Sequence, residues 1–102
     1  MSKFKFEVPA PLDSASAYSK VKKMLNGEND FKKFDPKVSC SFEDSSKAVN
    51  ITGSQFTAVL KIKDNDEKSC SVAIEVELPL ALSFFKGKIQ EVIEKNIKTV
   101  LT

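Results

Sequence analysis

The strictest pattern in this sequence is an alternation of apolar and polar residues in its second half. From Cys70 to Leu78 every second residue is apolar, and only serine, alanine or glutamate stands between them. A period of two places successive side chains on opposite faces of a β-strand. Because a lone strand cannot cover its own apolar face, this segment needs neighbouring strands and a covering layer. It therefore predicts an antiparallel sheet with one buried face and one face in water.

Four other segments repeat this alternation more briefly. They are residues 3–8, 38–43, 49–51 and 56–63. Turn-forming residues separate the later strands from one another, at residues 44–47, around Gly53 and at residues 64–67. Such short connections favour hairpins between strands that are consecutive in the chain.

Two further segments have helical spacing. The first runs from an N-cap at Asp13 or Ser14 to Gly27, and the second begins within residues 80–83 and continues towards the end of the chain. On a helical wheel the second segment has one apolar stripe. The stripe comprises Leu82, Phe85, Ile89, Val92, Ile93, Ile97 and Val100.

The order of elements is thus β-α-β-β-β-β-α. We expect an α+β fold, a single domain over residues 1–102, in which a five-stranded antiparallel sheet carries two helices packed on one face. Hairpin connections put the strands in the spatial order 1-5-4-3-2. Residues 28–37 form a polar loop in which Phe31 and Phe34 touch the core edge. Cys40 and Cys70 then lie about 14 Å apart, which is too far for a disulfide, so both are expected to be buried free thiols.

The charged residues argue against several classes of function. All sixteen basic residues are lysines, they are interleaved with fourteen acids, and histidine is absent. Lysine lacks the planar guanidinium group with which arginine recognises the edges of nucleic-acid bases. Histidine is the most common general base, member of catalytic triads and zinc ligand, so its absence argues against most sites of these kinds. We therefore expect no enzymatic activity, no cofactor, no metal and no nucleic-acid partner. No apolar run approaches the roughly 20 residues of a transmembrane helix, which favours a cytoplasmic location.

The stretch from Val76 to Ile97 resembles a family of small bacterial proteins, the polyhydroxyalkanoic acid system proteins. The resemblance is carried by Ile51-Thr-Gly-Ser, by the strand from Val72 to Leu78 and by Phe85-Lys-Gly-Lys-Ile. The family often has a tryptophan early in its first hairpin strand, where this chain has Phe42. The resemblance implies a link to polymer storage and no particular reaction. The layout is also similar to a shortened helix-grip or TATA-binding-protein-like fold, and in the helix-grip case the last helix can close over an apolar cavity.

Two candidate sites follow from the predicted packing. The first is the space between the apolar sheet face and the last helix, which could hold a hydroxyacyl chain or could be a filled core. Its residues are Leu60, Ile62, Val72, Ile74, Phe85, Ile89 and Ile93. Asn96 falls in the same helical stripe and could present its amide to a ligand or to the backbone.

The second candidate site is an excess of apolar residues at the start of the last helix. It comprises Leu80, Ala81, Leu82, Phe84 and Phe85, beside Lys86 and Lys88. Such a cluster could rest on a polymer or lipid surface, join two copies of the chain, or pack locally. The exposed sheet face around Val59 could also pair with a second copy or remain in water.

The sequence therefore favours a non-enzymatic accessory protein of polyhydroxyalkanoate storage. Its partner would be a granule surface, an acyl chain or another protein. Two alternatives stay open at this point. One is a small carrier of a hydrophobic ligand with a helix-grip fold, and the other is a homodimeric interaction module with no small ligand.

Overall fold

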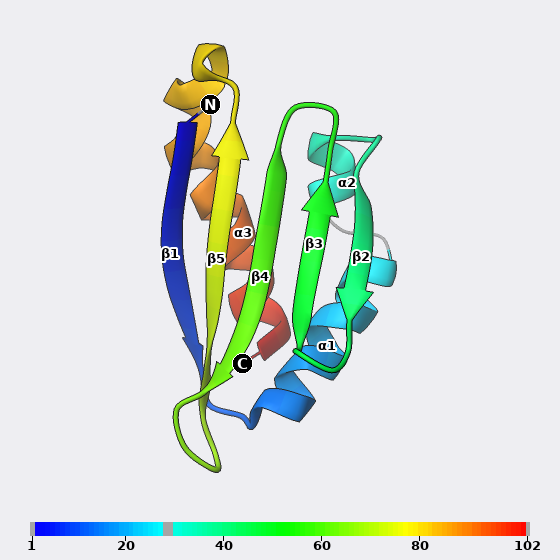
Figure 1. The fold of residues 1–102 in the computed structure, drawn as a ribbon, viewed down its shortest axis with the longest axis vertical. Coiled ribbons are helices and arrows are strands. Elements are labelled where there is room, and N and C mark those ends of the chain that lie inside the picture. The colour runs from blue at the N-terminus through cyan, green and yellow to red at the C-terminus, as the bar shows by residue number, and fades with distance from the viewer. Residues whose placement is uncertain (1, 28–29, 102) are drawn as a thin grey trace.

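The sheet has the predicted strands in the predicted spatial order. A computed structural model describes residues 2–27 and 30–101. Its strands are β1 (Ser2–Ala10), β2 (Ser39–Glu43), β3 (Ala48–Thr52), β4 (Thr57–Asp64) and β5 (Cys70–Leu78). They pair antiparallel in the order β1-β5-β4-β3-β2 (Figure 1). The predicted α+β class and strand order are therefore confirmed. One row of the exposed face runs through Lys5, Glu75, Val59, Asn50 and Ser41.

Strand β1 is longer than its alternation indicates. It continues through Pro9 to Ala10 and pairs along its whole length with β5. Proline has no N–H to donate, so it is tolerated on a strand only where one side needs no partner. The position of β1 at the edge of the sheet meets that condition.

Two long helices cover one face of the sheet, as Figure 1 shows. They are α1 (Ser14–Asn26) and α3 (Lys86–Leu101). Helix α1 starts at the predicted cap, because Asp13 Oδ2 accepts a hydrogen bond of 2.9 Å from the backbone N–H of Ser16. A short helix, α2 (Asp30–Phe34), stands where a loop was predicted. Phe31 reaches the core as expected, and the side chain of Phe34 lies outside the described part of the chain.

The core lies between the sheet and the two long helices. The residues that alternate into it on the central strands, such as Leu60, Val72 and Val76, are fully buried. Helix α3 contributes Ile89, Ile93, Ile97 and Leu101, one residue per turn. The prediction of one buried and one exposed sheet face is therefore confirmed.

The last helix begins later than its apolar stripe indicates. Residues Leu80–Phe85 form a 3-10 helix, η1, before α3 starts at Lys86. A 3-10 helix has three residues per turn, so positions before residue 86 do not continue the α-helical wheel. The prediction that Phe85 belongs to the buried stripe is wrong for this reason, since 39% of Phe85 is exposed.

The two cysteines differ in burial. Both are free thiols, on strands β2 and β5, which stand three places apart in the sheet. Cys70 is buried as predicted, whereas Cys40 is only half-buried. The reason is that β2 is an edge strand, which has a neighbour on one side only.

None of the described helices is both long enough and apolar enough to cross a membrane. In the same residues, no three acidic or cysteine side chains come together as metal ligands would.

Candidate functional site

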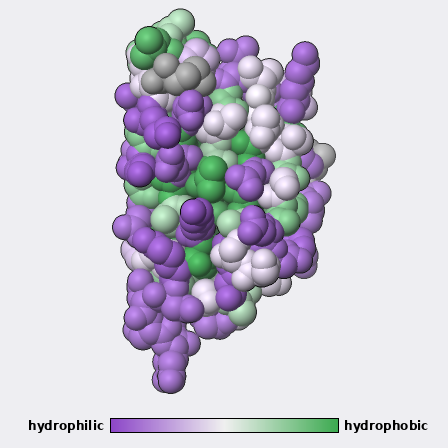
Figure 2. All heavy atoms as spheres, in the orientation of Figure 1, coloured by the Kyte–Doolittle hydropathy of each residue, from purple (hydrophilic) through white to green (hydrophobic). Residues whose placement is uncertain are grey.

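The most exposed large apolar side chains of the described residues lie in η1. Leu80 is 69% exposed, Phe84 76% and Phe85 39%. We call these three residues the η1 cluster. In Figure 1, η1 lies at the upper end of the molecule. Figure 2, in the same orientation, shows hydrophobic residues at that end. Large apolar side chains gathered in one place, rather than scattered singly, are typical of a contact surface.

The two aromatic rings of the η1 cluster contact each other. The ring centroids of Phe84 and Phe85 are 4.3 Å apart, and the ring planes are inclined by 34°. The backbone beneath them is held by a turn in which the N–H of Leu82 donates to the carbonyl of Pro79 at 2.9 Å. Leu82 itself is half-buried, so it anchors the turn while its neighbours face water.

Lysines border the η1 cluster. Lys86 and Lys88 lie in the first turn of α3, which contains no acidic residue. Lys88 is exposed and Lys86 is half-buried. The long alkyl stem of a lysine can lie along an apolar surface while its ammonium stays in water. An apolar patch with a cationic border is the arrangement that segments use at the boundary between water and an apolar phase.

The interior site of the sequence analysis is packed in this structure. Leu60, Ile62, Val72, Ile74, Ile89 and Ile93 are all buried core residues. Beside α3 lies a small cavity of about 10 Å³, bordered by Phe31, Phe56, Ile89, Val92 and Ile93. Sites for small molecules typically measure roughly 300–1,000 Å³. A chain of several carbons does not fit into a cavity of this size.

Asn96 uses its amide within its own helix. Its Nδ2 donates a hydrogen bond of 2.8 Å to the backbone carbonyl of Val92, one turn earlier. Of the two possibilities that the sequence left open for this side chain, the structure shows the contact with the backbone.

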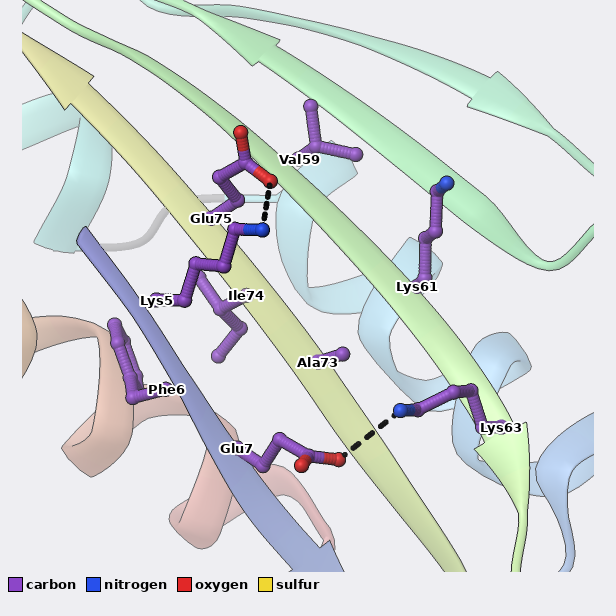
Figure 3. A pocket seen from close by; sticks show the side chains of 9 residues that line it. All are labelled: Lys5, Phe6, Glu7, Val59, Lys61, Lys63, Ala73, Ile74 and Glu75. Carbon is purple, nitrogen blue, oxygen red and sulfur yellow. Dashed lines mark ion pairs between the residues drawn. The ribbon is translucent and has the colours of Figure 1, made fainter. Parts of the chain in front are cut away.

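The exposed face of the sheet forms a broad hollow that is lined by charges (Figure 3). Its volume is about 530 Å³, and Val59 and Ala73 lie between its charged residues. Ion pairs join Lys5 to Glu75 at 3.6 Å and Lys63 to Glu7 at 3.3 Å.

The carboxylate of Glu75 lacks the environment of a general acid. Lys3 also approaches Glu75, at 3.2 Å, and its hydrogen bond is the main reason why the pKa of Glu75 lies below its ordinary value. A general acid needs the opposite, a raised pKa in a secluded site. Exposed ion pairs of this kind contribute little to stability, about 0–1 kcal/mol each. The hollow therefore has the character of a solvated sheet face.

Sequence reasoning missed Asp35, a buried carboxylate that organises the turn between β3 and β4. Asp35 is 3% exposed. Its Oδ2 accepts hydrogen bonds from the backbone N–H of Ser54 at 2.7 Å and of Gln55 at 3.3 Å. Burial raises the pKa of Asp35, but the hydrogen bonds from Lys37, Ser54 and Gln55 outweigh it and hold the pKa below its ordinary value. The only signal in the sequence is the glycine of Ile51-Thr-Gly-Ser, because a Cβ on Gly53 would collide with Asp35 Oδ2.

A second polar group that the sequence did not indicate joins α1 to the turn between β2 and β3. The hydroxyl of Tyr18 donates to Asp44 Oδ1 at 2.6 Å, and Lys22 Nζ reaches the same oxygen at 3.0 Å. Burial, together with the hydrogen bond to Asp44, raises the pKa of Tyr18 to about 12. Asp35, which is buried, and Asp44, which is exposed, both connect distant parts of the chain through hydrogen bonds.

Several solved structures share this fold. The di-domain ARO/CYC protein BexL from the BE-7585A biosynthetic pathway matches with a TM-score of 0.73 and 6% identity, over 99% of this chain and 45% of BexL. A START superfamily protein from Mycobacterium smegmatis matches with a TM-score of 0.64 and 10% identity, over 97% of this chain and 96% of that protein. The Zhui aromatase/cyclase from Streptomyces sp. R1128 matches with a TM-score of 0.62 and 7% identity, over 98% of this chain and 91% of the cyclase.

These matches confirm the helix-grip fold that the sequence analysis expected, and at such low identity they concern the fold alone. No curated protein matches this sequence. A family model described as "Putative polyhydroxyalkanoic acid system protein" matches residues 5–101, which is nearly the whole chain. This chain therefore belongs to the polyhydroxyalkanoic acid system protein family.

Proposed function

We propose that this protein is a non-enzymatic, cytoplasmic accessory protein of polyhydroxyalkanoate storage that docks on the surface of polymer granules through the η1 cluster. One observation carries the proposal: the most exposed large apolar side chains of the described residues gather in the six-residue helix η1. The family supplies the context, a system built around a hydrophobic polyester.

The size of the cluster suggests how strong such docking would be. Complete burial of a leucine or phenylalanine contributes about 1.5–3 kcal/mol, so Leu80 and Phe84 together would contribute about 3–6 kcal/mol. A free energy of about 4 kcal/mol corresponds to a dissociation constant of about 1 mM. One cluster therefore supports weak and reversible attachment, which suits a protein that exchanges between granule and solution.

The lysines beside the cluster suit a polyester surface. Such a surface exposes hydrocarbon together with ester carbonyl oxygens. The η1 cluster would enter the hydrocarbon, while the ammonium groups of Lys86 and Lys88 remain in water and donate hydrogen bonds to carbonyl oxygens. The position of both lysines directly after η1 makes the two contacts possible at once.

The packed interior favours surface docking over transport of a ligand inside the protein. A carrier of acyl chains needs a cavity many times larger than the roughly 10 Å³ beside α3. Opening such a cavity would require α3 to withdraw its own buried residues Ile89 and Ile93 from the core. The η1 cluster needs no such movement.

The test is co-sedimentation with particles of polyhydroxybutyrate. We expect Phe84→Ser to weaken the apparent affinity about tenfold or more, because a loss of about 1.4 kcal/mol corresponds to a factor of ten. Val59→Ser is the matched control, since it removes an apolar side chain from the exposed sheet face and should leave binding unchanged. Equal recovery of the unmodified protein and the Phe84→Ser variant would refute docking through η1.

The folded state must be intact for this comparison to count. Phe84 is largely exposed, so its replacement should change the free energy of unfolding by no more than about 0.5 kcal/mol. Urea unfolding followed by circular dichroism provides the check. A large loss of stability would mean that the ring supports the core, which its exposure does not indicate.

A further inference from the structure

The two edges of the sheet are protected to different degrees. Edge strands expose unpaired backbone groups, and proteins commonly guard them with lysine or proline. Strand β1 carries Lys3, Lys5 and Pro9. Strand β2, at the other edge, reads Ser-Cys-Ser-Phe-Glu and has neither lysine nor proline. The β2 edge therefore lacks the lysines and the proline that guard β1.

The apolar side of β2 is incompletely covered. Cys40 and Phe42 point towards the core but are only partly buried, whereas their partners on β3, Ile51 and Val49, are 1% exposed. Beside Cys40 lies a hollow of about 170 Å³, whose apolar lining includes Leu25, Phe31 and Val38. In Figure 1 no described strand lies outside β2. A further strand at this edge would cover these side chains.

The charges at the two ends of β2 are opposite in sign. Lys37 stands just before the strand, and Glu43 is its last residue. Both are exposed, and within residues 2–27 and 30–101 neither side chain makes an ion pair. An antiparallel copy of β2 would bring its acidic end to the basic end of the first. The edge is thus electrostatically complementary to itself.

We propose that β2 pairs antiparallel with β2 of a second copy of this chain, around a two-fold axis at Ser41. The two sheets would then form one continuous sheet of ten strands, five from each copy. In this register Ser41 lies opposite the partner's Ser41, Cys40 opposite the partner's Phe42, and Ser39 opposite the partner's Glu43. All five residues of β2 are paired, and no two like charges face each other.

This register also accounts for the hollow and the two unpaired charges. Side chains on opposing residues of an antiparallel pair lie on the same face. The partner's Phe42 would therefore lie beside Cys40, over the hollow that Leu25, Phe31 and Val38 line. On the other face Lys37 would approach the partner's Glu43. The inference is independent of granule docking, because the η1 cluster lies beyond β5 and not at β2.

Solution mass measured by light scattering gives the first test. The unmodified chain should have twice the mass of one 11.3 kDa chain at high micromolar concentration. Ser41→Lys should reduce it to the mass of one chain, because two ammonium groups would meet at the two-fold axis. Thr57→Lys, the same change at an exposed position of a central strand, should leave the dimer intact. A monomeric unmodified chain, or a Ser41→Lys variant that stays dimeric, would overturn the proposal.

A crosslink tests the register independently. Directly opposite residues of an antiparallel pair have Cβ atoms about 4.5–5.5 Å apart, near the range of a disulfide. In a Cys40→Ser background, Ser41→Cys should give a covalent dimer under mild oxidation on a non-reducing gel. Thr57→Cys in the same background should remain monomeric on that gel. Equal crosslinking of both variants, or none for Ser41→Cys, would exclude this pairing.

Discussion

Two connections at the same end of the sheet are built in opposite ways. The turn between β3 and β4 and the connection η1 between β5 and α3 lie close together, since Thr57 at the start of β4 pairs with Glu77 near the end of β5 (Figure 1). The first connection is polar, and the buried carboxylate of Asp35 holds it from within. The second exposes Leu80 and Phe84 to water.

This difference indicates that the β3–β4 turn serves the stability of the fold, whereas η1 serves binding. The β3–β4 turn satisfies buried polar groups, which stabilises the fold. Leu80 and Phe84 leave most of their surface in water, so burial in the core does not explain a leucine and a phenylalanine at these positions. Changes at the turn should therefore alter stability, and changes at η1 should alter binding.

The largest effect should come from Gly53→Ala in the turn. The added Cβ would overlap Asp35 Oδ2 and lie about 3.0 Å from the ring of Phe56, so the carboxylate or the turn must shift. Overpacking of this kind costs about 1–3 kcal/mol. We expect the free energy of unfolding, measured by urea titration, to fall by that amount. An unchanged value would show that Asp35 can leave its position without loss.

Gly87→Ala, the same type of substitution next to η1, should change the free energy of unfolding by less and in the opposite direction. No atom lies within 4 Å of the Cβ that alanine would add at Gly87, in the first turn of α3. Alanine restricts the unfolded chain and fits the helix, which raises stability by about 0.4–1 kcal/mol. The same urea titration measures this change in the free energy of unfolding. A destabilised Gly87→Ala variant would contradict the contrast between the two connections.

The smallest effect should come from the titration of Asp35. Because its pKa in the folded state lies below the ordinary value of 3.8, the carboxylate contributes stability above that pH. The contribution is lost as the pH falls through the folded-state pKa. We expect the stability difference between the unmodified protein and Asp35→Asn to be constant from pH 7 to about pH 5 and to shrink below about pH 4. A difference that persists at pH 2.5 would assign the effect of Asp35 to packing instead of charge.

The strands and their order could be predicted from the sequence because period-two alternation is a local signal. Residues 70–78 show it without interruption, and the short turns between strands left few possible topologies. The composition of the η1 cluster was equally visible, since three large apolar residues exceed what one helical face can bury. The prediction for Phe85 failed because a helical wheel assumes 100° per residue, and the 3-10 helix does not follow that spacing.

The sequence alone therefore established one apolar sheet face, two amphipathic helices to cover it and a surplus of apolar residues after Pro79. The fold in three dimensions decided which of those residues stay in water, how small the cavity beside α3 is and why Gly53 must lack a side chain. These properties depend on contacts between distant parts of the chain, as between Asp35 and Ser54, which lie 19 residues apart. Periodicity reports on neighbours in the chain, and only packing brings such distant residues together.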